Sequence, residues 1–140
     1  MAELTAVALQ TVASGQNVLF TETPVCGGRC IQHRDGAGVV TLRGLTNQCR
    51  ARYRVSFGAN IAVPTGGAAG AISVAIAIAG EPIPSTNMIV TPAAAAEFFN
   101  VFGAIFIEVP AGCCLNIAVE NTSGADIAVQ NANLIVERVA

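Results

Sequence analysis

Apolar and polar residues alternate along most of this chain, most regularly in the segment Arg50–Val63. Its odd-numbered positions are all apolar, whereas its even-numbered positions begin with Arg50, Arg52 and Arg54. Successive side chains of a β-strand point to opposite faces of a sheet. The alternation therefore predicts one long strand with an apolar face and a face that carries three guanidinium groups.

The same period of two recurs along the rest of the chain and predicts further strands. These segments are Val18–Glu22, Val39–Arg43, Ala71–Ala79, Phe98–Val109, Leu115–Glu120 and Ile127–Val139. Turns rich in glycine, proline and asparagine separate them, and many short strands with regular turns are typical of an all-β sandwich or jelly roll. The alanine-rich segment Pro92–Glu97 is the one helix candidate.

Composition adds an argument about assembly. Of the 140 residues, 53% are hydrophobic and only 11% are charged, about half the charged share of an ordinary globular domain. This length suits one domain, and a single domain with so few charges must leave apolar surface exposed. A contiguous apolar surface usually marks an interface, so we expect a homo-oligomer.

Composition also excludes several classes of protein. High hydrophobicity with little charge is the reverse of a disordered chain, and a pI near 5.2 gives no basic footprint for nucleic acid. Val55–Gly80 is uncharged, but Pro64, Gly66 and Gly67 interrupt it, so no membrane span is expected. The N-terminus lacks the basic start and apolar core of a signal peptide, so export by the ordinary secretory route is not expected.

Five cysteines are the first candidates for chemistry: Cys26, Cys30, Cys49, Cys113 and Cys114. Cys26 and Cys30, with His33 three residues on, have the spacing of zinc ligands, and Cys49 or Cys113 would be the fourth. The alternatives are a disulfide or free thiols in a glycine-rich loop. We favour a disulfide over zinc and expect no metal or cofactor. The odd count leaves at least one thiol unpaired or crosslinked between subunits, and adjacent Cys113 and Cys114 must have different partners.

The arginine stripe formed by Arg50, Arg52 and Arg54 has two interpretations. It could contact an anion or an acidic glycan, or it could form ion pairs with acidic residues on neighbouring strands. The candidate partners are Glu97, Glu108, Glu120 and Glu137. We favour ion pairs, because arginine suits fixed, bidentate pairing at an interface.

Signs of catalysis are weak. His33 is the only histidine and lies beside Arg34-Asp35 in a glycine-rich loop, where we expect it to form hydrogen bonds. The chain has no G-x-S-x-G elbow and no phosphate-binding P-loop, and its acidic residues are scattered singly rather than paired as in glycosidases. The protein is therefore not expected to be an enzyme.

The aromatic residues could stack on sugars or bases, but their period-two placement favours a core or an assembly axis instead. They are Tyr53, Phe57, Phe98, Phe99, Phe102 and Phe106.

The order of motifs in the last hundred residues, Val39 to Val139, resembles the tumour-necrosis-factor-like (TNF-like) jelly rolls. The matching pieces are Gly38–Leu42 followed by Arg52–Phe57, Ile72–Ile78 with Gly80–Ile83, Val109–Gly112 followed by Leu115–Val119, and the closing Ala132–Val139. The resemblance implies an antiparallel two-sheet sandwich of ten strands that assembles as a homotrimer around an apolar threefold axis. It points to bacterial and phage relatives: heads of collagen-like spore-surface proteins, and virion decoration or fibre proteins.

Two departures from the family pattern matter. The chain has no Gly-X-Y tract, so it would be a head without a collagen stalk, and the region Cys26–Cys49 lies outside the pattern. We divide the chain into residues 1–20, a tether or first strand, and residues 21–140, the jelly-roll domain.

The expected function is structural, as a trimeric capsid-decoration or fibre-head protein on a phage virion surface with other virion or surface-assembly proteins as partners. The alternative is a trimeric receptor- or carbohydrate-binding head on a bacterial cell or spore surface.

Overall fold

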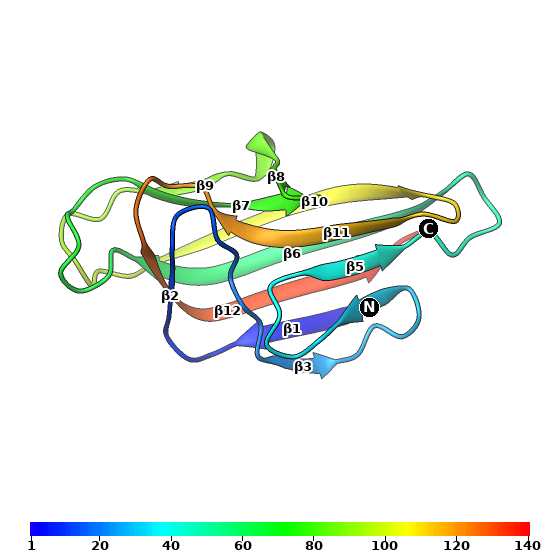
Figure 1. Cartoon of the computed structure of the whole chain (residues 1–140), viewed down its shortest axis with the longest axis horizontal. Helices are drawn as coiled ribbons and strands as arrows, with labels where there is room; N and C mark the ends of the chain where they lie inside the picture. Colours follow the sequence, from blue (N-terminus) through cyan, green and yellow to red (C-terminus); the bar gives the residue numbers. More distant parts are fainter.

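The computed structural model describes all residues from Met1 to Ala140 as two antiparallel sheets packed face to face (Figure 1). The strands are β1 (Ala2–Ala6), β2 (Gln10–Val12), β3 (Glu22–Val25), β4 (Ile31–His33), β5 (Val40–Arg43), β6 (Arg50–Ala62), β7 (Ile72–Ile78), β8 (Glu81–Pro82), β9 (Met88–Val90), β10 (Phe99–Pro110), β11 (Cys114–Asn121) and β12 (Ile127–Arg138). Sheet A has the order β10-β6-β12-β1-β3, with β2 also paired to β12. Sheet B has the order β4-β5-β11-β7-β8, with β9 also paired to β7.

The long strand predicted from the alternation in Arg50–Val63 is β6, and its two faces are as expected. Tyr53 and Phe57 are fully buried between the sheets, while Arg52 and Arg54 are exposed on the outer face of sheet A. Inward rows of apolar residues from both sheets form the core, which is the usual interior of a β-sandwich. Alternation in the sequence therefore located the core face of sheet A correctly.

Strand β10 lies at one edge of sheet A and pairs with β6 along its whole length. In this register Phe102 is opposite Gly58, Phe106 is opposite Arg54, and Glu108 is opposite Arg52. The aromatic residues at positions 102 and 106 therefore share the outer face of the sheet with the arginine stripe. The predicted strand at Phe98–Val109 is confirmed with a shift of one residue at each end.

The N-terminal segment is part of sheet A. Strand β1 lies between β12 and β3, and Leu4 is fully buried in the core. Among the other apolar residues in positions 1–20, Val12 is buried, whereas Val7 and Leu9 are exposed. Strands β1 and β2 both lie in this segment and belong to sheet A, and its division from residues 21–140 as a tether or first strand stays a prediction.

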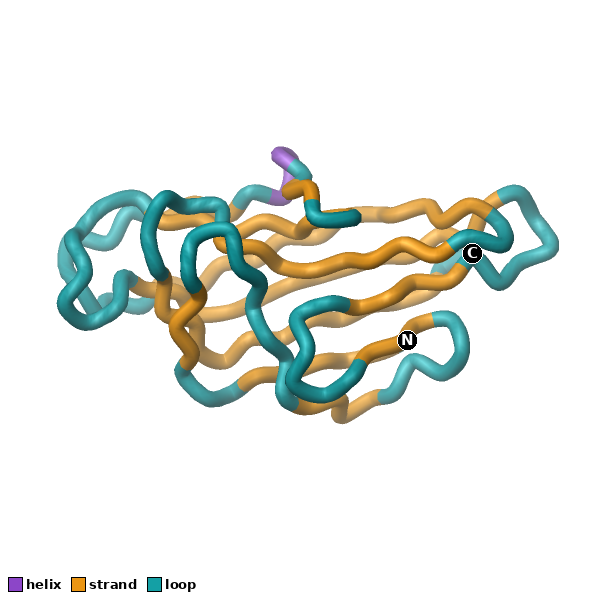
Figure 2. Tube along the Cα trace, viewed as in Figure 1, coloured by secondary structure: helices purple, strands orange, loops and turns teal.

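The prediction of a helix at Pro92–Glu97 is wrong. Ala96 has a positive φ of 61° and donates its backbone N–H to Val63 O at 2.8 Å, so the segment is fastened to the end of β6 in a non-helical conformation. The one helical element is a short 3-10 turn at Pro84–Thr86, drawn in purple in Figure 2. None of the helical structure is long and apolar enough to cross a membrane.

Candidate interaction face

The outer face of sheet A exposes two large aromatic side chains from β10. Phe102 is 65% and Phe106 is 63% exposed, which is unusual for residues of this size. A Cβ atom added to Gly58 would lie 3.7 Å from the Phe102 ring. The Phe102 ring therefore packs against the backbone of β6 at a glycine, which has no side chain. Phe98 and Phe99, at the start of the strand, are also exposed. Phe99 is opposite Ile61 and has the inward parity of Val101. We therefore call the surface made by Phe102 and Phe106 the aromatic face.

Tyr53 and Phe57 do not belong to this face and lie in the core, one of the two places expected for the aromatic residues. Both are fully buried inside the chain's own sandwich, because odd-numbered positions of β6 point inward and even-numbered positions of β10 point outward. The two groups of aromatic residues therefore have separate roles, one in the core and one on the surface.

Ion pairs border the aromatic face on the side of Pro110. Arg50 Nη1 lies 2.7 Å from Glu108 Oε2, and Arg52 Nη2 lies 2.9 Å from Glu108 Oε1, so one carboxylate accepts hydrogen bonds from two guanidinium groups. The hydrogen bond from Arg50, followed by that from Arg52, lowers the pKa of Glu108, and the hydrogen bond to Glu108 raises the pKa of Arg50. All three groups are solvent-exposed, so these pairs define register more than they add stability.

Arg54 is the remaining member of the stripe and differs from the other two. It lies between Phe106 on β10 and Glu137 on β12 in the strand register, and it forms no ion pair within 4.0 Å. Among the four predicted acidic partners, only Glu108 pairs with the stripe. Arg54 is thus an exposed, unpaired charge beside an exposed aromatic ring.

A row of amides borders the aromatic face on its other side. Asn100 Nδ2 donates to Asn60 Oδ1 at 3.2 Å, and Asn60 Nδ2 donates to Asn131 Oδ1 at 3.5 Å. Asn131 has a positive φ of 56° where the β12–β6 register shifts. Sequence reasoning missed this row, because β12 joins it only through a bulge that the sequence pattern does not reveal.

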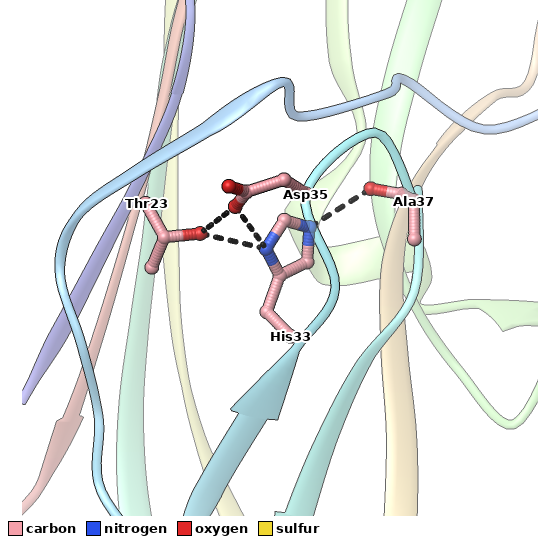
Figure 3. A network of polar contacts seen from close by, with 4 residues as sticks. All are labelled: Thr23, His33, Asp35 and Ala37. Atoms are coloured by element: carbon pink, nitrogen blue, oxygen red, sulfur yellow. Dashed lines mark hydrogen bonds and ion pairs between the residues drawn. The ribbon is translucent and has the colours of Figure 1, made fainter.

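His33 is the centre of a separate polar network, shown in Figure 3. Its side chain is 2% exposed, and its ring packs edge-on against Phe20. Nδ1 lies 2.9 Å from Thr23 Oγ1, and Nε2 lies 3.0 Å from Ala37 O. The Thr23 hydroxyl also lies 2.8 Å from Asp35 Oδ1.

The proton count in this network allows two arrangements. Nε2 must donate in both, because a carbonyl oxygen only accepts. If Thr23 donates to Asp35, Nδ1 must donate to Thr23 and the imidazole is charged. If Thr23 donates to Nδ1, the imidazole is neutral and Asp35 loses that hydrogen bond. In both cases the network uses both nitrogens of His33 to fasten β3, β4 and the loop that follows β4.

All five cysteines lie at one end of the sandwich, at the right in Figure 1, on the β3–β4 loop, the β5–β6 loop, the β10–β11 turn and the first residue of β11. All are free thiols, and only Cys30 is partly buried. The structure forms none of the disulfides considered above. No three histidine, cysteine or acidic side chains come together in a geometry that would hold a metal. The zinc site considered for Cys26, Cys30 and His33 is therefore not assembled, because both nitrogens of His33 have other partners.

Cys30 has fixed surroundings. Its Sγ accepts a hydrogen bond from Arg138 Nη1 at 3.1 Å, and the buried hydroxyl of Tyr53 donates to Arg43 O at 2.6 Å and to Cys30 O at 3.3 Å. Desolvation by burial, followed by the nearby Cys30, raises the pKa of Tyr53. Tyr53 therefore stays a neutral donor and links β6 in sheet A to the strands of sheet B.

Comparison with known proteins identifies the fold. No protein-family model and no curated protein matches the chain. Solved structures match almost all of it, including Eiger TNF from S. frugiperda, with a TM-score of 0.66 and 13% identity over 99% of this chain and 91% of that chain. The globular domain of zebrafish complement 1qA protein has a TM-score of 0.64 and 14% identity, over 96% of this chain and 94% of that one. Murine APRIL has a TM-score of 0.63 and 12% identity, over 97% and 98%.

The two six-stranded antiparallel sheets and these full-length matches agree with the resemblance found in the sequence motifs. The chain has the TNF-like jelly-roll fold.

Proposed function

We propose that this protein is a non-enzymatic structural head that assembles as a homotrimer through the outer face of sheet A. The observation that carries this proposal is the aromatic face, in which Phe102 and Phe106 are both more than 60% exposed. Burying a phenylalanine side chain contributes roughly 1.5–3 kcal/mol, so two such residues from each of three subunits supply a substantial driving force.

Two further features support assembly through this face. Strand β10 has twelve residues and no strand beyond it in sheet A, and a long exposed edge strand with apolar residues invites pairing or aggregation unless it is covered. The Arg50–Glu108–Arg52 ion pairs and the amide row border the apolar centre on opposite sides. This arrangement of an apolar core within a polar rim is typical of protein–protein interfaces.

We further propose that the trimer is a capsid-decoration or fibre-head protein on a phage virion, where it packs against other virion proteins. This assignment rests on the motif resemblance to phage and bacterial heads. Its mechanism is packing of preformed surfaces rather than catalysis.

Oligomeric state tests the assembly. Light scattering of the wild-type chain at micromolar concentration should give three times the chain mass of 14.2 kDa. Phe102→Glu should give monomers, because Phe102 is opposite Gly58 and each interface would then bury a carboxylate with no cation opposite it. Ile89→Glu is the matched control, since Ile89 is 62% exposed on β9 in sheet B, and it should stay trimeric. A monomeric wild type would overturn the proposal.

Location and binding test the finer assignment. Immunogold labelling of material from the source strain should place the protein on virions, and label confined to cells or spores would contradict the virion assignment. On a glycan array the trimer should show no binding that free sugar displaces. Specific, displaceable binding would instead support the carbohydrate-binding head.

A further inference from the structure

Two of the three cysteine-bearing segments are held close together by backbone hydrogen bonds. Ala111 donates its N–H to Cys49 O at 2.9 Å, and Gly44 donates to Cys113 O at 2.8 Å. Gly112 donates back to Gly44 O at 3.0 Å. The β5–β6 loop and the β10–β11 turn are therefore fastened to each other at both ends of the β5–β6 loop, although their cysteines are more than sixty residues apart in the chain.

Backbone contacts show which cysteines lie near each other. Cys49 directly precedes β6, and its carbonyl oxygen accepts the N–H of Ala111, two residues before Cys113. The chain crosses from sheet A to sheet B at this end through the tight turn Pro110–Cys113, in which Cys113 donates its N–H to Pro110 O at 3.0 Å. Cys113 therefore lies on the turn that is bonded to Cys49, and both residues are exposed.

The other three thiols are placed differently. Cys114 starts β11 opposite Arg43 and shares the outward row of Asn116. Cys30 directly precedes β4, which is separated from β11 by β5. Its sulfur accepts a hydrogen bond from Arg138. Cys26 lies in the β3–β4 loop with Cys30. Cys49 and Cys113 are the pair that adjoining loops bring together.

From this arrangement we propose that Cys49 and Cys113 form a reversible thiol–disulfide site, a modification that links the β5–β6 loop to the β10–β11 turn within one chain. With a small disulfide such as oxidised glutathione, one protein thiolate attacks a glutathione sulfur and releases one glutathione thiol. The second protein thiolate then attacks the mixed disulfide and releases the other. The two cysteines are oxidised, the glutathione disulfide is reduced to two thiols, and the protons of the cysteines pass to these leaving groups.

The positions of the arginines make the test direct. Trypsin separates Cys26, in the peptide 1–29, from Cys30, in 30–34, and from Cys49, in 44–50, while 55–138 carries both Cys113 and Cys114. After treatment with oxidised glutathione and quenching with an alkylating agent, the 44–50 peptide should be joined to 55–138. Intact mass should fall by two hydrogen atoms, and a reductant should reverse both changes.

Two neighbouring variants identify the partner. Cys113→Ser should abolish the crosslink and leave Cys49 free to react with the alkylating agent. Cys114→Ser is the matched control and should keep the crosslink. Three outcomes would each overturn the proposal. The first is the reverse result for the two variants, and the second is an alkylated Cys49 in the oxidised wild type. The third is a crosslinked species that migrates as a dimer or trimer in a denaturing gel without reductant. These readouts do not depend on trimer assembly, so this proposal and the proposed function fail separately.

Discussion

At the scale of single residues, Glu108 is the acid most strongly shaped by its neighbours on the interaction face. Two guanidinium groups lower its pKa below the ordinary value of a glutamate, with the hydrogen bond from Arg50 the larger cause. A lowered folded-state pKa adds stability at pH values above the unfolded pKa, and that stability is lost as pH falls through the folded pKa. The pairs should therefore open only in acid.

A carbon-detected NMR titration of the Glu108 carboxyl should show this directly. Its midpoint should lie below 4.5 in the wild type and should rise in Arg50→Gln. Arg52→Gln should raise it less, because the hydrogen bond from Arg50 is the larger cause. Glu97→Gln is the control, since Glu97 forms no ion pair, and it should leave the midpoint unchanged. Equal midpoints in the wild type and Arg50→Gln would contradict the assignment.

Single residues also show where prediction from sequence ends. The outward parity of the arginine stripe follows from alternation alone, but the choice of Glu108 among four acids depends on the register of β10 against β6. His33 is correctly predicted to form hydrogen bonds. Its partner Thr23 has no sequence signal, because the contact exists only once β3 and the loop after β4 lie side by side.

At the scale of elements, the long strands follow from the sequence and the short ones do not. β6 alternates because one of its faces is buried, whereas β7 alternates branched with small residues and is buried on both faces at its centre. β8 and β9 contain two or three residues and owe their conformation to pairing with β7. The error at Pro92–Glu97 has the same origin, since a hydrogen bond to Val63 outweighs the weak helix propensity of a few alanines.

The packing of the β5–β6 loop against the β10–β11 turn gives a prediction about an element boundary. A Cβ atom on Gly44 would lie 2.1 Å from Pro110 O, a backbone atom that cannot move away alone. Gly44→Ala should therefore separate the two loops and cost about 2 kcal/mol or more. Gly124→Ala is the control, because a Cβ there meets nothing within 4 Å and φ is not positive, and it should change stability by less than about 0.5 kcal/mol. Urea unfolding measures the stability of both variants. A Gly44→Ala variant as stable as the wild type would show that the two loops can move apart at little cost.

At the scale of the whole molecule, the apolar excess in the composition is divided between two places. Most of it fills the sandwich, and a smaller part is concentrated on one outer face at Phe102 and Phe106. Composition predicts that exposed apolar surface exists but not where it lies, and the sequence pattern left open whether each aromatic residue is in the core or at an assembly axis. Its location follows from the pairing of β10 at the edge of sheet A, which is a property of the completed sheet.

The concentration dependence of thermal unfolding gives the prediction that belongs to this scale. If three chains separate when a trimer unfolds, mass action makes Tm rise with protein concentration, whereas Tm of a monomer stays constant. For three chains of this length, a roughly hundredfold increase in concentration should raise Tm by about 5–7 °C. Phe102→Glu should have a lower Tm that does not change with concentration, while Ile89→Glu should behave as the wild type. Scanning calorimetry across that range decides the matter, because a Tm independent of concentration in the wild type would mean that the aromatic face stays exposed and unpaired.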